Sequence, residues 1–165
     1  PLIFAISIPV LMVIGIALSI YLPTLFVKPE YDFLYSIGGD YSYRNEYAVE
    51  SGKLVKKPPT LPNTVKTSQE PELYVHDVSE NASTKVSFEE AQNLNLDSSI
   101  QSPDGFEITY GSNGDGIFPI FYWSDRDYGS RYIKGQGVSK KLNLHFESSF
   151  QSYYNDLRFL GWIQK

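Results

Sequence analysis

The chain lacks cysteine entirely and has only one methionine and two histidines among its 165 residues. The absence of cysteine excludes a disulfide framework, thiolate catalysis and a cysteine-ligated metal site. Basic residues are also scarce, because 14 Lys and Arg stand against 19 Asp and Glu and give a formal net charge of -5. Nucleic-acid binding requires clustered Lys and Arg. We therefore expect no cofactor and no nucleic-acid partner.

Charged side chains are also absent from the whole of residues 1–27. About 20 apolar residues at roughly 1.5 Å rise are enough to cross a bilayer core. The run therefore predicts a single-pass transmembrane helix over 1–27 that anchors a domain over 28–165. The few Lys and Arg after the run favour placing that domain outside the cytoplasm. The residues assigned to the anchor are Leu2, Ile3, Phe4, Ile6, Ile8, Val10, Leu11, Val13, Ile14, Ile16, Leu18, Ile20 and Tyr21.

The apolar run is also compatible with a signal peptide or with a helix buried in an oligomer. A signal peptide has a shorter apolar core behind basic residues, although Ala17-Leu18-Ser19 would serve as a cleavage site. The oligomer alternative has a parallel among known proteins. Gly15 and Pro23 stand eight residues apart, which resembles the spacing in the apolar N-terminal helix of type IV pilins. That resemblance implies a subunit that polymerises into a surface filament.

Beyond Pro29 the apolar pattern changes to period two, which is typical of strands. A helix is expected after Ser87, because Glu90 completes the capping-box spacing. Residues 57–72 hold four of the ten prolines, which favours a linker or surface strap. About nine or ten short strands predict an all-β domain, a sandwich or a partly open barrel. The expected strands cover 31–37, 44–57 (a hairpin turning at Ser51-Gly52), 73–78, 84–88, 106–110, 117–123, 130–135, 141–146 and 156–164.

The segment 72–111 contains Tyr74-Val75-His76-Asp77 and the turn sequence Ser102-Pro103-Asp104-Gly105. It resembles one blade of the β-propellers of TolB and of dipeptidyl peptidases, in which a YxxD strand and an SPDG turn recur. The resemblance implies a blade-like pair of hairpins over this segment. It covers only that part of the chain and carries no activity with it.

A candidate metal loop is GSNGDG at 111–116, where Asn113 and Asp115 alternate as calcium ligands do. An EF-hand loop also requires carboxylates at the positions of Gly111 and Tyr122. Since neither is present, a tight turn between strands is the preferred interpretation and no metal is expected.

Six further residues have weaker claims to chemistry. Asp125, Asp127 and Ser130 would serve a membrane-tethered hydrolase, but a surface cluster of ion pairs is the simpler interpretation. His76 and His145 each lie in a predicted strand, so they share a metal only if those strands are neighbours. The sequon at Asn81 matters only in a source that glycosylates such sites.

Aromatic residues are the one compositional excess, with 13 Tyr, 10 Phe and 2 Trp. They either fill a small core or form a tyrosine-rich contact face for protein or glycan. We expect a non-catalytic, membrane-anchored β domain acting in binding or cell-surface assembly. A pilin-like filament subunit is the alternative, and a tethered hydrolase is the third. Odd-numbered spacing within 31–35 and within 41–47 places most of each group on one face of a sheet, and the candidate contact face consists of Tyr31, Tyr35, Tyr41, Tyr43 and Tyr47.

Overall fold

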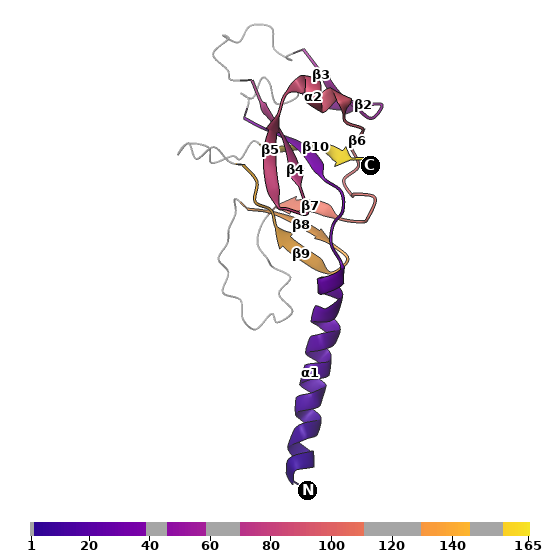
Figure 1. Cartoon of the computed structure of the whole chain (residues 1–165), viewed down its shortest axis with the longest axis vertical. Coiled ribbons are helices and arrows are strands. Elements are labelled where there is room, and N and C mark those ends of the chain that lie inside the picture. The colour runs from indigo at the N-terminus through magenta and orange to yellow at the C-terminus, as the bar shows by residue number, and fades with distance from the viewer. Residues whose placement is uncertain (1, 39–45, 59–69, 111–129, 146–156) are drawn as a thin grey trace.

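The computed structural model describes residues 2–38, 46–58, 70–110, 130–145 and 157–165, and in the N-terminal helix it describes the side chains of residues 7–19 and 26. The N-terminal helix projects away from a β-rich domain (Figure 1). The elements are α1 (Leu2–Phe26), β1 (Phe33–Ile37), β2 (Tyr47–Glu50), β3 (Lys53–Lys56), β4 (Glu72–Asp77), β5 (Ala82–Val86), α2 (Phe88–Asn93), β6 (Leu96–Asp97), β7 (Glu107–Tyr110), β8 (Arg131–Gly135), β9 (Val138–Lys141) and β10 (Arg158–Ile163).

The described strands form three antiparallel sheets. The largest has the order β5-β4-β1-β10-β6, a second has the order β7-β8-β9, and the third is the β2-β3 hairpin. Strand β1 lies at the centre of the five-stranded sheet, where Phe33 pairs with Trp162 of β10 and with His76 of β4. All four residues from Phe33 to Ser36 are buried, as expected for a strand that is covered on both faces.

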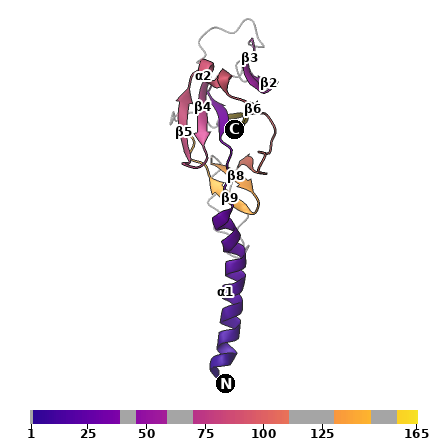
Figure 2. The same cartoon turned by 45° about the vertical axis from the view of Figure 1, so that its right-hand side comes forward.

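The two faces of the five-stranded sheet carry separate cores because successive side chains of a strand point to opposite faces. The β7-β8-β9 sheet lies on the side towards α1, whereas the β2-β3 hairpin and α2 lie on the other side (Figures 1 and 2). The core on the first side, here called the aromatic cluster, consists of Phe33, Tyr35, Tyr74, Val78, Phe106, Ile133, Leu142, Leu144, Leu157 and Trp162. The core on the second side, the aliphatic cluster, consists of Leu34, Tyr47, Leu54, Leu73, Ala91, Leu96 and Leu160.

Local signals in the sequence explain several element boundaries. Ser51 and Gly52 have φ of 50° and 78°, so the predicted β2-β3 hairpin turn is confirmed. The predicted capping box is also confirmed, because the Ser87 side chain accepts from the Glu90 N–H while the Glu90 carboxylate accepts from the Ser87 N–H. Gly135 is required for packing, since a Cβ there would lie 2.6 Å from the Gly105 carbonyl oxygen.

The prediction of a transmembrane anchor over 1–27 is wrong. Within the described residues, no helix combines the length and the apolar character that a membrane span requires. The single-pass membrane localisation that depended on the anchor falls with it.

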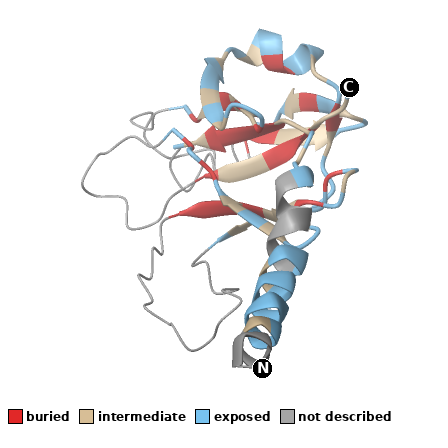
Figure 3. Ribbon diagram, turned by 60° about the horizontal axis from the view of Figure 1, so that its bottom comes forward, coloured by how far each residue is buried: buried red, intermediate tan, exposed pale blue. Residues whose placement is uncertain are grey.

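The residues assigned to the anchor fall into two groups. Those with described side chains are all exposed along the helix (Figure 3), and they are Ile8, Val10, Leu11, Val13, Ile14, Ile16 and Leu18. The side chains of the others lie outside the described set, and these are Leu2, Ile3, Phe4, Ile6, Ile20 and Tyr21.

The expected sandwich or partly open barrel is also replaced, by three separate sheets. The strand expected over 141–146 ends at Lys141, and residues 142–145 belong to no strand. Leu142 and Leu144 are nevertheless buried while Asn143 is exposed. The period-two pattern therefore comes from an extended segment that contributes Leu142 and Leu144 to the aromatic cluster and belongs to no strand. The expected strand at 117–123 and most of the expected strap at 57–72 lie outside the described residues.

Candidate functional site

Helix α1 carries most of the exposed large apolar side chains in the described residues. Those side chains are 48–78% exposed, and they are Ile8, Val10, Leu11, Met12, Val13, Ile14, Ile16, Leu18 and Phe26. Residues 10–14 are consecutive, and at 3.6 residues per turn five consecutive positions surround the whole helix. The helix therefore offers an apolar surface on every side rather than one amphipathic stripe.

The C-terminal end of α1 is fixed to the β domain. Val27 and Tyr31, which follow the helix, pack against the aromatic cluster. The Glu30 N–H donates to Asp104 Oδ2 at 2.8 Å, which joins this segment to the turn at residues 102–105. The apolar helix is thus held in a defined position relative to the β domain.

A row of stacked rings crosses the five-stranded sheet on the side of the aromatic cluster. The ring of Tyr35 stacks on Tyr74 with centroids 5.5 Å apart, and Tyr74 stacks on His145 at 5.1 Å. The His145 N–H donates to Tyr35 Oη at 3.1 Å. Burial raises the pKa of Tyr35, so this phenol stays protonated at neutral pH. The arrangement holds rings in place and supplies no nucleophile.

The hydroxyl of Tyr74 continues this row to a pair of charges. Tyr74 Oη donates to Glu72 Oε2 at 2.6 Å, and Lys85 Nζ forms an ion pair with the same carboxylate. The hydrogen bond from Lys85, followed by that from Tyr74, lowers the pKa of Glu72. Glu72 is therefore a fixed anion and an unsuitable proton donor at neutral pH.

His76 is fully buried between β1 and β5. Its Nδ1 lies 2.9 Å from Ser83 Oγ, and its ring lies 4.9 Å from that of Phe33. Burial lowers the pKa of His76 to about 4, so the ring is neutral at pH 7. His145 stacks on Tyr74, two residues from His76 on the same face of β4. Within the described ranges, however, no group of three or more His, Cys, Asp or Glu side chains is placed to hold a metal.

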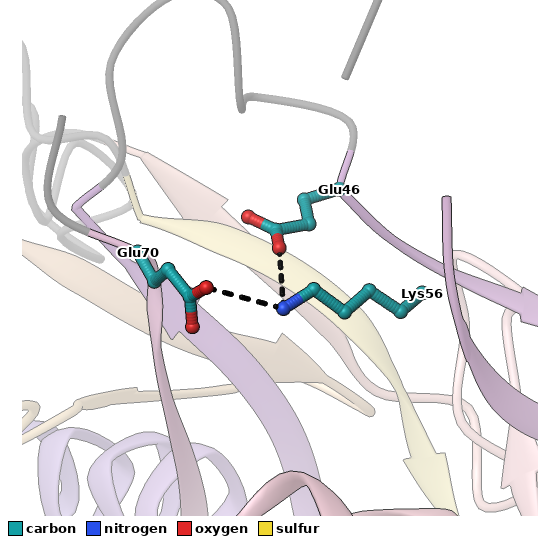
Figure 4. Close-up of polar contacts among 3 residues, drawn as sticks. All are labelled: Glu46, Lys56 and Glu70. Carbon is teal, nitrogen blue, oxygen red and sulfur yellow. Dashed lines mark hydrogen bonds and ion pairs between the residues drawn. The ribbon is translucent and has the colours of Figure 1, made fainter. Parts of the chain in front are cut away.

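A charged triad joins Lys56 of β3 to Glu46, which precedes β2, and to Glu70 (Figure 4). Lys56 Nζ lies 2.8 Å from Glu46 Oε1 and 3.4 Å from Glu70 Oε1. The Glu46 side chain is only 3% exposed, whereas that of Glu70 is 70% exposed. The hydrogen bond from Lys56 to Glu46 raises the pKa of Lys56, so Lys56 cannot act as a base. The triad therefore fixes chain segments and is a poor catalytic centre.

The predicted tyrosine face is divided by the fold. Tyr35 lies in the aromatic cluster and Tyr47 in the aliphatic cluster, on opposite sides of the five-stranded sheet. Tyr31 is half-buried against the aromatic cluster. Tyr41 and Tyr43 lie outside the described residues. The described tyrosines of the set therefore do not share one exposed face.

Of the remaining residues with a predicted role, Ser130 is described and the four others are not. Ser130 is buried immediately before β8. Asn113, Asp115, Asp125 and Asp127 lie outside the described residues, so the candidate calcium loop and the paired aspartates stay predictions.

Asn81 of the sequon has a structural role that the sequence did not reveal. With φ of 53°, it completes the turn between β4 and β5. Its Nδ2 donates to the Lys141 carbonyl at 3.2 Å, and its Oδ1 accepts from the Asn143 N–H at 3.0 Å. These bonds tie the five-stranded sheet to the chain that follows β9. The one signal in the sequence is the residue type, because asparagine tolerates the left-handed backbone that tight turns often require.

Sequence reasoning also missed the two most deeply buried charges, Glu46 and Arg131. Neither residue carries a signal in the sequence, because strand alternation places residues 131 and 133 on one face of β8 but does not show that a charge on that face is buried.

A comparison of the chain with protein-family models gives no match, and comparisons with curated proteins and with solved structures give none either. The β4-β5 hairpin and the turn at 102–105 are present, but the next strand, β7, belongs to a different sheet from β4 and β5. The likeness of 72–111 to a propeller blade stays a prediction.

Proposed function

We propose that this protein is a non-catalytic assembly subunit, in which the α1 helices of several copies pack against one another and the β domains project from the helical core. The observation that carries this proposal is the apolar surface that surrounds α1 and is exposed along residues 8–18 (Figure 3). A helix that is hydrophobic all round requires burial on all sides. Among the described side chains near the helix, those that pack against the core of the β domain are Val27 and Tyr31, which follow α1.

A second copy of this chain fits α1 better than an unrelated partner does. Residues 1–27 carry no charge, so the helix offers nothing with which an ion pair would select a different surface. Several neighbours are needed to cover all sides of α1, and identical helices of equal length supply them. Nothing lies within 4 Å of a Cβ built at Gly15, so a neighbouring helix has room to approach there.

The energetics favour a bundle over a single pair of helices. Full burial of one Leu, Ile or Val side chain contributes about 1.5–3 kcal/mol. Because the apolar side chains of α1 are about half exposed, burying each of them in a bundle would contribute roughly half of that free energy. Association itself costs at least about 4 kcal/mol in lost freedom of motion. One helix pair would leave the far side of each helix exposed, so assemblies of more than two copies are expected.

Engineered disulfide cross-linking tests the proposal directly, because the chain has no cysteine of its own. Val13→Cys places a single thiol in the middle of α1. We expect the full chain carrying Val13→Cys to form covalent dimers under mild oxidation in detergent-free buffer. Ile100→Cys is the matched control, since Ile100 is an exposed apolar residue of the β domain. It is expected to stay mostly uncross-linked.

Sedimentation analysis supplies an independent measurement of the same assembly. The unmodified chain should sediment as a species several times heavier than one 18.7 kDa chain. Val13→Glu should dissociate it, whereas Ile100→Glu should leave it intact. A monomeric full chain in plain buffer would contradict the proposal. So would a chain that floats with lipid vesicles while Val13→Cys fails to cross-link, because lipid rather than another copy would then cover α1.

A further inference from the structure

Arg131, the first residue of β8, is a buried cation without a described counter-ion. The residue is only 1% exposed. Its Nε and Nη2 atoms are buried, and neither has a hydrogen-bond acceptor among the residues that the structure describes. Its guanidinium carbon lies 3.0 Å from the centre of the Tyr110 ring on the neighbouring strand β7. Tyr110 is 67% exposed, so the guanidinium lies directly beneath a surface side chain.

The two unpartnered nitrogens belong to one edge of the guanidinium. In arginine, the Nε–H and one Nη2–H point in the same direction and form a planar fork. That fork matches the two oxygens of a carboxylate or of a phosphate. The ring of Tyr110 lies against the guanidinium carbon, so it contacts the group without satisfying the hydrogen-bonding capacity of Nε or Nη2. Burial lowers the pKa of Arg131, although an arginine side chain stays protonated in proteins.

We propose that the edge of Arg131 formed by Nε and Nη2 is a binding site for a carboxylate ligand, with Tyr110 as its cover. An uncompensated buried charge is strongly unfavourable, and one bidentate anion removes that penalty. A carboxylate carries a single negative charge and neutralises Arg131 completely. A phosphate dianion would leave a net negative charge in the same buried place, so the carboxylate is the better match.

The site is independent of assembly through α1. It lies on the β7-β8-β9 sheet and uses only side chains of the β domain. Its ligand is either a free small carboxylate or the carboxylate of a peptide, and both present the same two oxygens to the fork.

Calorimetric titration of the full chain with sodium acetate tests the site. Sodium chloride and inorganic phosphate, at matched ionic strength and pH, are the comparison ligands. We expect acetate to bind saturably and to raise the melting temperature, while chloride does neither and phosphate binds more weakly. If acetate binds, a short peptide with a free carboxyl terminus and its C-terminal amide show whether a peptide carboxylate is also accepted.

Two variants assign the binding to Arg131. Arg131→Lys keeps the charge but loses the planar fork, so acetate affinity should fall by at least about tenfold. Lys134→Met removes a positive charge from the same strand without touching the fork, and acetate affinity should stay within about twofold of the original.

Three outcomes would overturn the proposal. The first is acetate acting like chloride, which would mean that the chain itself supplies the missing acceptor. The second is tighter binding of phosphate than of acetate, and the third is an unchanged affinity in Arg131→Lys. Should Arg131→Lys fail to fold, the titrations of the unmodified chain still decide between the carboxylate site and the first two outcomes.

Discussion

The two faces of the five-stranded sheet are built from the same strands but from different chemistry. Phe33 and Leu34 are neighbours in β1 and are both fully buried, yet Phe33 lies in the aromatic cluster and Leu34 in the aliphatic cluster. The first face holds stacked rings and tilted ring pairs. The second is packed mainly by leucine side chains and is covered by short elements, the β2-β3 hairpin and α2.

The aromatic face also accommodates the polar atoms of its rings. Tyr35 Oη accepts from the His145 N–H, and Trp162 Nε1 donates to the Ser99 carbonyl at 3.1 Å. Rings with a polar edge combine a large apolar area with a hydrogen-bonding group. The face that holds these rings is also the face against which Val27 and Tyr31, the residues that follow α1, are packed. The aliphatic cluster therefore contributes packing alone, whereas the aromatic cluster also holds the chain segment that leads from helix α1 into the β domain.

The largest expected effect on stability comes from truncating one buried side chain on each face in turn. Phe33→Ala should lower the free energy of unfolding by about 4 kcal/mol and Leu34→Ala by about 3 kcal/mol. Phe33 loses more because its ring also pairs with those of His76, Trp162 and Phe159, and such pairs add to area burial. Urea unfolding followed by circular dichroism measures both values.

Equal or reversed costs for the two variants would show that the ring contacts add nothing to packing. Phe33→Ala should also loosen α1, because Val27 and Tyr31 share its cluster. Protease cleavage between α1 and β1 should then be faster in Phe33→Ala than in Leu34→Ala. This second measurement separates a general loss of stability from a loss confined to the aromatic face.

The next effect concerns pH and is confined to the aromatic face. The pKa of His76 is about 4 in the folded chain, compared with about 6.5 for an unperturbed histidine. Between these values the unfolded state binds more protons than the folded state, so stability falls as pH falls from about 6.5 towards 4. At pH 5 the loss amounts to about 2 kcal/mol relative to pH 8. Burial lowers the pKa of His76, and the charge of Lys140 adds to that effect; together they outweigh the hydrogen bond with Asn81 and the charges of Asp32 and Asp77, which favour the protonated ring.

The measurement is the difference in unfolding free energy between pH 8 and pH 5. His76→Gln should reduce that difference by about 2 kcal/mol, because the group that takes up the proton on unfolding is gone. His145→Gln is the control, since His145 is exposed, and it should keep the original difference. If His76→Gln and the unmodified chain lose the same amount, the buried ring is not the source of the pH dependence.

Local features of this fold could be predicted from sequence because they depend on a few neighbouring residues. The turn at Ser51-Gly52 and the cap at Ser87 follow from backbone freedom and from hydrogen bonds within four residues. The pairing of Phe33 with Trp162 joins distant parts of the chain, and no spacing rule specifies it. Strand alternation also says nothing about residues across a turn. The spacing therefore does not relate Tyr35 to Tyr47, and only the fold shows that they lie in opposite clusters.

The candidate sites were less predictable than the strands. The apolar run was visible at once, but hydropathy alone led to the wrong prediction of a membrane span. Arg131 reads as an ordinary charged strand residue, and only the tertiary structure shows that it is buried against Tyr110. Buried charges depend on what the rest of the chain places around them, and periodicity carries no such information.

The smallest expected effect tests how the aliphatic face is covered. Ala91 of α2 is fully buried in the aliphatic cluster, and α2 starts at the capping box of Ser87 and Glu90. Ser87→Ala removes the acceptor for the Glu90 N–H and should cost about 1 kcal/mol of stability. Glu89→Gln is the matched control, because Glu89 lies in the same first turn but takes no part in the box, and it should cost clearly less. Equal costs in urea unfolding would mean that the charge of the first turn, and not the cap, holds α2 on the sheet. Neither variant should alter the pH dependence, because that belongs to His76 on the opposite face.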